Sequence, residues 1–516
     1  MRALSVPVVL SSVVLTGWLG GARAQDLGPV TRGGSASTAS QPAGDQSLEP
    51  GVIPQPSIDS PGLVAGFTLG ELYTDNLKLA ASGKPKQSSW ITQVGPFVKA
   101  ARNGPRFAGV VNYSLTGYLY AGQSGGSQLA QNLDAKGLLT VLPQHLFIDG
   151  MAQYGRAIIN NQLPTGGGTF FLTQNHANVA RGTLSPYWTQ QFGDLGTMTL
   201  RYSYGRVVYG TRGIPGENRS LLNGIPDFTS NGVQFSFASP TYKTWAWDFG
   251  YSDQRLVPDF GPSRDFAVAK LGGSVQVNLN TRLLADVGRE NKFLLDGTVD
   301  KLGATFWDAG FGWSNMRDSV RLMFGKRFYG SSYQFSWTHE AALLTTSVSY
   351  EERPTDLNQQ LLGGNGGVGV LPPIGSGVIP SLREQQVFLM KRASASATYL
   401  MPKGRLRLDA YDERRTYFTQ DNRQEKVANV SLDWMLELGP LTTLTPTLGW
   451  QRYQFRDGQV RYNHYGELAL VHQVNPKNFG SIKLRHDSSS VASEAAVPGT
   501  HGYKVNVIFV QWTHLF

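Results

Sequence analysis

The sequence has 516 residues, of which 11% are aromatic and only 16% are charged, and it contains 60 glycines. This mixture suits many strands and turns better than helices. Cysteine is absent, which excludes disulfides, thiolate metal sites, cysteine catalysis and lipid attachment to an N-terminal cysteine. The formal net charge of +9 is spread along the chain rather than clustered, so we expect no nucleic-acid partner.

The N-terminal part of the chain contains two segments that precede any folded domain. Residues 1–24 combine a basic start, an apolar stretch and the small-x-small sequence Ala22-Arg23-Ala24, which predicts a signal peptide that is removed on export. Residues 25–61 are rich in glycine, serine, proline and glutamine, with almost nothing apolar to bury. We expect this second segment to be a flexible, disordered periplasmic linker.

The remainder of the chain, residues 62–516, alternates between apolar and polar positions. Leu406 and Leu408, for example, are separated by Arg407 and preceded by Arg405. Because side chains alternate between the two faces of a strand, this period predicts strands with one apolar and one polar face. About 22 such segments follow one another, most of them about ten residues long, which is enough to cross a bilayer when tilted.

The connections between these segments alternate in length. Residues 103–105 and 401–404 are short connections, whereas 157–173 and 351–385 are long ones. Short turns on one side and long loops on the other are typical of an outer-membrane barrel whose turns face the periplasm. The short link at 329–332 breaks this rule and leaves room for a merged or missing pair of strands.

We therefore predict an all-β fold, a single transmembrane antiparallel up-and-down β-barrel that occupies residues 62–516. The strand number is expected to be even, about 18 to 22. The predicted location is the cell outer membrane, where the barrel is surrounded by lipid and lipopolysaccharide.

The end of the sequence lies inside a predicted strand. Trp512, His514 and Phe516 share one face of it with Ile508 and Val510. A terminal strand exposes an unpaired edge unless it pairs with another strand, and closure onto the first strand is one solution. We predict that Trp512, His514 and Phe516 form the signal recognised by the barrel-assembly machinery, with His514 at a position where many such signals carry tyrosine.

If the apolar faces touch lipid, the residues between them line the lumen. Basic groups along that wall would concentrate an anionic polymer and let it move, because each contact is hydrated and weak. The alternative interpretation is structural, since Arg–Asp ladders across neighbouring strands stiffen a barrel wall. The candidate lumen residues are Arg201, Arg321, Arg327, Arg405, Arg407, Tyr411, Lys483 and Arg485.

Catalysis finds little support in the sequence. The eight histidines form no His-Glu-x-x-His or comparable metal pattern. His486, Asp487 and Ser488 are adjacent, but neighbouring residues of a strand point to opposite faces. We therefore expect no enzyme, no cofactor and no metal site. The glycine-rich stretch 363–370 lacks the Lys-Ser/Thr of a phosphate-binding loop, and the loop 351–385 around it is long enough to fold into or over the pore mouth.

Two segments resemble a known family, the outer-membrane β-barrel proteins associated with the exosortase (PEP-CTERM) system, whose genes lie in exopolysaccharide loci. Residues 66–99 are similar to the first hairpin of that family, in which a strand ends in a Tyr-Thr-Asp-Asn sequence before a serine-rich return. Residues 324–352 are similar to a second segment of the family, although a histidine–arginine cluster found there is replaced here by Glu340-Ala341-Ala342-Leu343. The positions of the second segment that match in kind are Gly325, Arg327, Phe328, Gly330, Tyr333 and His339.

The resemblance implies a porin-like outer-membrane barrel with a part in the export of a secreted exopolysaccharide. Its expected partners are an anionic polysaccharide and periplasmic or inner-membrane export components. The alternatives are a general or anion-selective porin for small solutes and a surface adhesin or scaffold that uses the long loops. An energised receptor is disfavoured, because it needs a plug domain of more than about a hundred residues ahead of the barrel.

Overall fold

The alternating segments form strands over almost all of the chain that is described. The computed structural model describes residues 61–122, 127–173, 175–210, 225–241, 243–295, 298–362, 386–419, 423–492 and 499–516. The predicted signal peptide, the predicted linker up to residue 60 and the glycine-rich stretch 363–370 lie outside these residues. Within them, no helix is both long and apolar enough to cross a membrane.

The elements follow one another in a simple order, with the short helix α2 (Leu357–Leu361) between β15 and β16. The strands are β1 (Gly62–Thr74), β2 (Ser89–Asn103), β3 (Phe107–Tyr120), β4 (Ser127–Leu142), β5 (Leu146–Ile158), β6 (His176–Gln191), β7 (Thr197–Gly210), β8 (Phe228–Ala238), β9 (Trp245–Pro258), β10 (Arg264–Gln276), β11 (Thr281–Phe293), β12 (Val299–Ser314), β13 (Asp318–Arg327), β14 (Gly330–Glu340), β15 (Leu344–Thr355), β16 (Phe388–Met401), β17 (Gly404–Tyr417), β18 (Gln424–Gly439), β19 (Thr442–Gln454), β20 (Val460–Asn475), β21 (Asn478–Val491) and β22 (Tyr503–Leu515).

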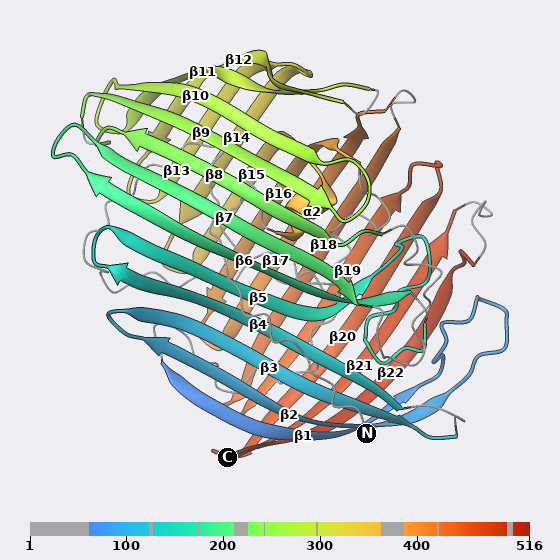
Figure 1. Ribbon diagram of the computed structural model, residues 1–516. Helices are drawn as coiled ribbons and strands as arrows, with labels where there is room; N and C mark the ends of the chain where they lie inside the picture. The colour runs from blue at the N-terminus through green and yellow to red at the C-terminus, as the bar shows by residue number, and fades with distance from the viewer. Residues whose placement is uncertain are drawn as a thin grey trace, which may run out of the picture.

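Each strand pairs antiparallel with the next strand along the chain, and β1 pairs with β22, which closes the sheet (Figure 1). The closing seam runs from Gly66 opposite Leu515 to Thr74 opposite Val507. The backbone amide of Phe516 donates to the carbonyl oxygen of Ala65 over 3.0 Å, so the terminal strand is paired to its end. The predicted antiparallel up-and-down barrel with an even strand number is confirmed, with 22 strands among the described residues.

Polar side chains fasten the loop end of this seam. Asp75 accepts hydrogen bonds from the backbone amide (2.7 Å) and side-chain amide (2.9 Å) of Asn506, and pairs with Lys86 at 3.0 Å. Asn76 donates to the carbonyl oxygen of Lys504 over 3.1 Å. Partial burial alone would raise the pKa of Asp75, but the hydrogen bonds from Asn506 and Lys86 outweigh it, and the pKa is lowered. Asp75 and Asn76 end the Tyr-Thr-Asp-Asn sequence of the first family-like segment, and here they tie β22 to the loop after β1.

The two faces of each strand meet different surroundings. On β22, Ile508, Val510 and Trp512 are 47%, 50% and 44% exposed, whereas Val505 and Phe509 on the other face are buried. Exposed apolar side chains recur on the outward faces of strands around the whole barrel. A continuous apolar surface of this extent suits hydrocarbon rather than water, and a closed sheet leaves no unpaired backbone within the bilayer. The protein is therefore a multi-pass β-barrel of the outer membrane.

The two ends of the barrel differ in the length of their connections. At the end where β22 terminates, on the left of Figure 1, the turns contain two to six residues. At the opposite end the connections are longer, spanning residues 75–88, 159–175 and 356–387 of the sequence. The exception predicted at 329–332 is a hairpin whose turn is Phe328-Tyr329, between β13 and β14, and no strand pair is missing there.

Candidate functional site in the barrel lumen

Ion pairs between strands line the inner wall of the barrel. Arg201 on β7 pairs with Asp149 on β5, across the intervening strand β6. Arg327, at the end of β13, contacts Glu290 of β11 and Asp308 of β12, each at 2.6 Å. Both arginines are largely buried, and the carboxylates offset the free-energy cost of removing the guanidinium groups from water.

A second group of paired charges lies on β20 and β21. Lys483 and Arg485 share Glu467 of β20, at 2.9 Å and 3.2 Å. Arg485 also contacts Asp487, two residues further along the same face of β21, at 2.8 Å. One side chain thus bridges two carboxylates on the wall.

The other predicted lumen residues also lie on inward faces. Arg407 contacts Asp409 at 2.8 Å, and the Tyr411 ring centroid lies 4.5 Å from the guanidinium carbon of Arg392. Arg405 shares the inward face of β17 with Arg407. Arg321 lies on the same face of β13 as Arg327.

The structure therefore places all eight predicted lumen residues on the inner wall, but in separate groups on β7, β13, β17 and β21 rather than in one cluster. At least five of the seven cations, Arg201, Arg327, Arg407, Lys483 and Arg485, have a carboxylate within 4.0 Å. The wall thus carries many paired charges, as the interpretation in terms of Arg–Asp ladders expects. Whether these residues contact a transported molecule stays a prediction.

Sequence reasoning missed the most deeply buried cation of the wall. Arg415 is 0% exposed and is held by Glu413 at 2.5 Å and Glu425 at 3.4 Å. The Tyr453 hydroxyl accepts a hydrogen bond from Arg415 over 2.9 Å and donates one to Glu425 over 3.0 Å. The signal was present in the sequence, because Arg415 continues the two-residue period of Arg405 and its neighbours on β17.

The loop between β5 and β6, residues 159–175, folds into the lumen. Phe170 and Phe171 pack in a cluster of buried apolar residues contributed by β1, β2, β3, β4 and β22. The Tyr120 hydroxyl donates to the Phe170 carbonyl oxygen over 2.6 Å, and Arg156 donates to the Thr169 carbonyl oxygen over 2.8 Å. Apolar burial and hydrogen bonds together hold this loop against the wall.

The same loop touches the paired charges of the wall at a glycine. A Cβ atom on Gly167 would lie 2.1 Å from Nη2 of Arg485, so a side chain at this position would force the loop or the guanidinium group to shift. The amide of Gly166 next to it donates to the Tyr503 hydroxyl over 3.1 Å, and Arg461 donates to the Gln162 carbonyl oxygen. The loop thus narrows the lumen and rests on Arg485.

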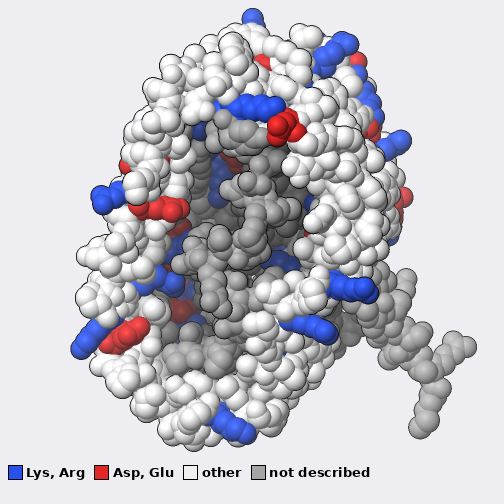
Figure 2. All heavy atoms as spheres, turned by 90° about the vertical axis from the view of Figure 1, so that its left-hand side faces the viewer, with Lys and Arg blue, Asp and Glu red and all other residues white. Residues whose placement is uncertain are grey.

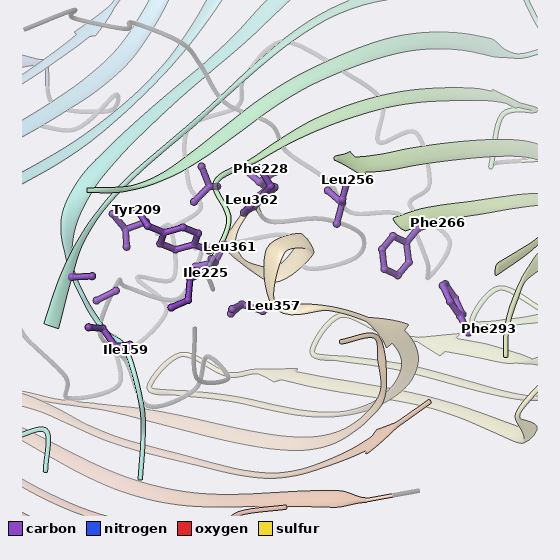
Figure 3. Packing of buried hydrophobic residues seen from close by; sticks show 14 residues of the cluster. Ile159, Tyr209, Ile225, Phe228, Leu256, Phe266, Phe293, Leu357, Leu361 and Leu362 are labelled. Carbon is purple, nitrogen blue, oxygen red and sulfur yellow. The ribbon is translucent and has the colours of Figure 1, made fainter. Parts of the chain in front are cut away.

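A second segment enters the lumen after β15. Asp356 caps α2 by accepting a hydrogen bond from the Gln359 amide over 2.7 Å, and it pairs with Arg264 at 3.2 Å. Burial raises the pKa of the Asp356 carboxyl, against the opposing effect of the Arg264 guanidinium. Figure 3 shows Leu357 and Leu361 of α2 among inward side chains of the surrounding strands. The described start of the long loop predicted to fold into or over the pore mouth therefore folds inward.

The lumen consequently differs between its two ends. Figure 2 shows the end with the short turns, which is hollowed and carries both basic and acidic side chains on its wall. The end with the long loops is narrowed from inside by the 159–175 loop and α2. No group of histidines and carboxylates that would hold a metal ion occurs among the described residues. The arrangement suits the passage of a hydrated molecule past a polar wall.

The second family-like segment, residues 324–352, spans the end of β13, all of β14 and most of β15. A Cβ atom on Gly325 would lie 2.1 Å from the Trp307 carbonyl oxygen, so this glycine permits close approach of β12 and β13. Phe328 in the turn joins the apolar cluster around α2, and Gly330 has a φ of 117° that favours glycine. His339 contacts Asp318 at 2.9 Å at the far end of the hairpin. These matching residues shape the hairpin and its contact with the inner wall.

The predicted assembly signal lies on the outward face of the closing strand. Trp512 and Phe516 are exposed there, and the His514 ring contacts the side chain of Asn478 at 2.9 Å. The His514 and Phe516 rings meet edge to face, with centroids 5.5 Å apart. Recognition of this signal by an assembly machinery stays a prediction.

Comparison with known proteins found no protein-family model that matches the sequence and no matching curated protein. Among solved structures, the chain is similar to the FrpB iron transporter from Neisseria meningitidis (F5-1 variant), with a TM-score of 0.48 and 10% identity over 88% of this chain and 82% of that chain. It is also similar to the siderophore receptor PirA from Pseudomonas aeruginosa, with a TM-score of 0.43 and 9% identity over 90% of this chain and 81% of the other. For the ferric enterobactin receptor PfeA of the same organism the TM-score is 0.44, with 10% identity over 90% and 82%.

Proposed function

We propose that the protein is a passive outer-membrane conduit through which a secreted exopolysaccharide is exported. The proposal is supported by the resemblance of residues 66–99 and 324–352 to the exosortase-associated family. It also agrees with the size of the barrel, because barrels of 16 or more strands are wide enough to enclose an aqueous channel.

The observation that carries the proposal is the chemistry of the inner wall. Its charges are largely paired, and hydrogen-bonding groups stand between them. Asn429, Gln451, Asn463 and Ser489 form one inward row across β18–β21. Amides and hydroxyls exchange hydrogen bonds readily with sugar hydroxyls and water, so a hydrated polymer meets many weak contacts and no strong trap.

Deletion of the gene tests this function. Polymer is expected to accumulate in the periplasm of the deletion strain, and a plasmid that supplies the wild-type protein should restore secretion. The measurement is the amount of polysaccharide in the periplasmic and medium fractions. Unchanged secreted polymer in the deletion strain would contradict the proposal.

A second candidate function is an anion-selective porin for small solutes. The inward loop of residues 159–175 favours it, because a narrowed lumen restricts passage by size. A porin would conduct ions in planar bilayers and leave polymer secretion intact when deleted. The combination of the two assays therefore separates the candidates.

A further inference from the structure

Three cations occupy directly opposed positions on the outward face of β16, β17 and β18. Lys391 lies opposite Arg414, and Arg414 lies opposite Lys426. Arg452 on β19 lies opposite Ala428, which is two residues closer to the short turns than Lys426 on the same outward face. Directly opposed side chains on antiparallel strands are about 5 Å apart, and like charges at that spacing destabilise a sheet. This cation row, defined by Lys391, Arg414, Lys426 and Arg452, therefore needs a source of negative charge.

The protein supplies only part of that charge. Lys391 contacts Glu352 at 3.0 Å, and the buried Glu352 also accepts a hydrogen bond from the Tyr350 hydroxyl over 2.5 Å. Arg414 and Lys426 form no ion pair with any residue that the structure describes. Asp412 is on the same outward face of β17 as Arg414, two residues closer to the short turns. Two or more positive charges thus remain without a contacting carboxylate from the described part of the chain.

Two outward cations elsewhere on the barrel, on β9 and β11, are arranged differently. Arg255 on β9 lies opposite Asp265 on β10, with 3.8 Å between its Nε and the carboxylate. Lys292 on β11 lies opposite Asp300 on β12. For both Arg255 and Lys292 the cross-strand neighbour is an acid, so the sheet itself supplies a negative charge beside each of these two cations. The like-charged neighbours in the cation row are a local departure from this pattern.

The cation row lies at the outer edge of the apolar band. Tyr399 and Trp434 are exposed on the outward face near the short turns, and Lys391 is eight residues from Tyr399 along β16. At about 3.3 Å per residue and a tilt of about 40°, that separation is roughly 20 Å along the barrel axis, close to the height of about 25 Å of an outer-membrane apolar band.

We propose that the cation row binds a phosphate group of a phosphorylated glycolipid in the outer leaflet of the membrane. A phosphate supplies the missing negative charge at the depth where lipid head groups meet the barrel. Arg414 offers the planar donor pair that matches phosphate oxygens, and Lys426 adds a second positive charge beside it. This lipid site is independent of what the lumen transports.

Native mass spectrometry of the full-length barrel in neutral detergent tests the site. The probe is a bis-phosphorylated, acylated glucosamine disaccharide, compared with its dephosphorylated form. The wild-type protein is expected to retain the phosphorylated form in preference. Arg414→Gln combined with Lys426→Gln is expected to weaken that binding at least tenfold, because two charge-assisted contacts are lost.

The matched control is Arg255→Gln combined with Lys292→Gln, which removes the same charge from the outward face and should bind as the wild type does. Equal weakening in both double variants, or equal binding of the dephosphorylated lipid, would overturn the proposal. If the test variant does not fold, salt decides the matter: wild-type binding must weaken as ionic strength rises, and salt-independent binding overturns the site. None of these outcomes depends on polymer export.

Discussion

Replacing Gly167 with alanine is expected to loosen the 159–175 loop from the inner wall. The new Cβ atom would lie 2.1 Å from Nη2 of Arg485, and the ordinary contact distance begins at 3.4 Å, so loop or guanidinium must move by about 1.3 Å. Arg485 does not yield easily, because Asp487 and Glu467 hold its guanidinium at 2.8 Å and 3.2 Å. The displacement therefore falls mainly on the loop.

The size of the effect follows from overpacking. Forcing an extra methyl group into a close contact costs about 1–3 kcal/mol. An energy change of that size alters a population by about 5- to 150-fold. Phe170 and Phe171 still favour the docked loop, since each buried phenylalanine contributes about 1.5–3 kcal/mol. The variant should thus open briefly and repeatedly rather than stay open.

Single-channel recording in planar bilayers measures this directly. Openings of larger conductance are expected to be at least several times more frequent in Gly167→Ala than in the wild type. Gly480→Ala is the control, because an added Cβ there meets nothing within 4 Å. Identical conductance distributions in Gly167→Ala and the wild type would refute the inference that this loop narrows the path.

Three further changes probe the wall and the closing strand. Arg415→Ala leaves two buried carboxylates without their cation and is expected to destabilise the barrel by about 3–5 kcal/mol. The control is the neighbouring outward change Arg414→Ala, which should cost under about 0.5 kcal/mol. The stabilities of the two variants are compared by the temperature at which the folded band disappears on electrophoresis. Arg405→Glu with Arg407→Glu should lower any anion preference of the reversal potential in a salt gradient, and an unchanged potential would argue against an ion path along β17. Removal of Phe516 deletes the last hydrogen bond of the seam and part of the predicted assembly signal, so assembled barrel in outer-membrane fractions should fall several-fold, a result that normal levels would contradict.

The barrel was predictable because the alternation of apolar and polar residues that specifies each strand is local in the sequence. Alternation at Leu406, Arg407 and Leu408 already separates an outward from an inward face, and the structure keeps that assignment. The strand number stayed open between about 18 and 22, because the two-residue turn at Phe328-Tyr329 hides a hairpin where a long loop was expected.

The interior of the barrel was less accessible to sequence reasoning, because its contacts join distant residues. Arg201 and Asp149 are 52 positions apart, and nothing local in either strand marks them as partners. The 159–175 loop docks through Phe170 against a cluster that includes Tyr503, more than three hundred residues away along the chain. Inward faces follow from a two-residue period, whereas the pairing of Arg201 with Asp149 depends on the register of β5, β6 and β7, and docking of the loop on the closed sheet.

The claim that polymer passes through the lumen is tested most directly by cysteine labelling in cells, since the chain has no cysteine of its own. Ser396→Cys places a thiol on the inward face of β16, and Ala395→Cys places one on the outward, lipid-facing side. A membrane-impermeant thiol reagent should label Ser396→Cys more slowly while polymer synthesis is switched on than while it is off, and should not label Ala395→Cys in either state. Equal labelling of Ser396→Cys with and without polymer synthesis would contradict export through this barrel.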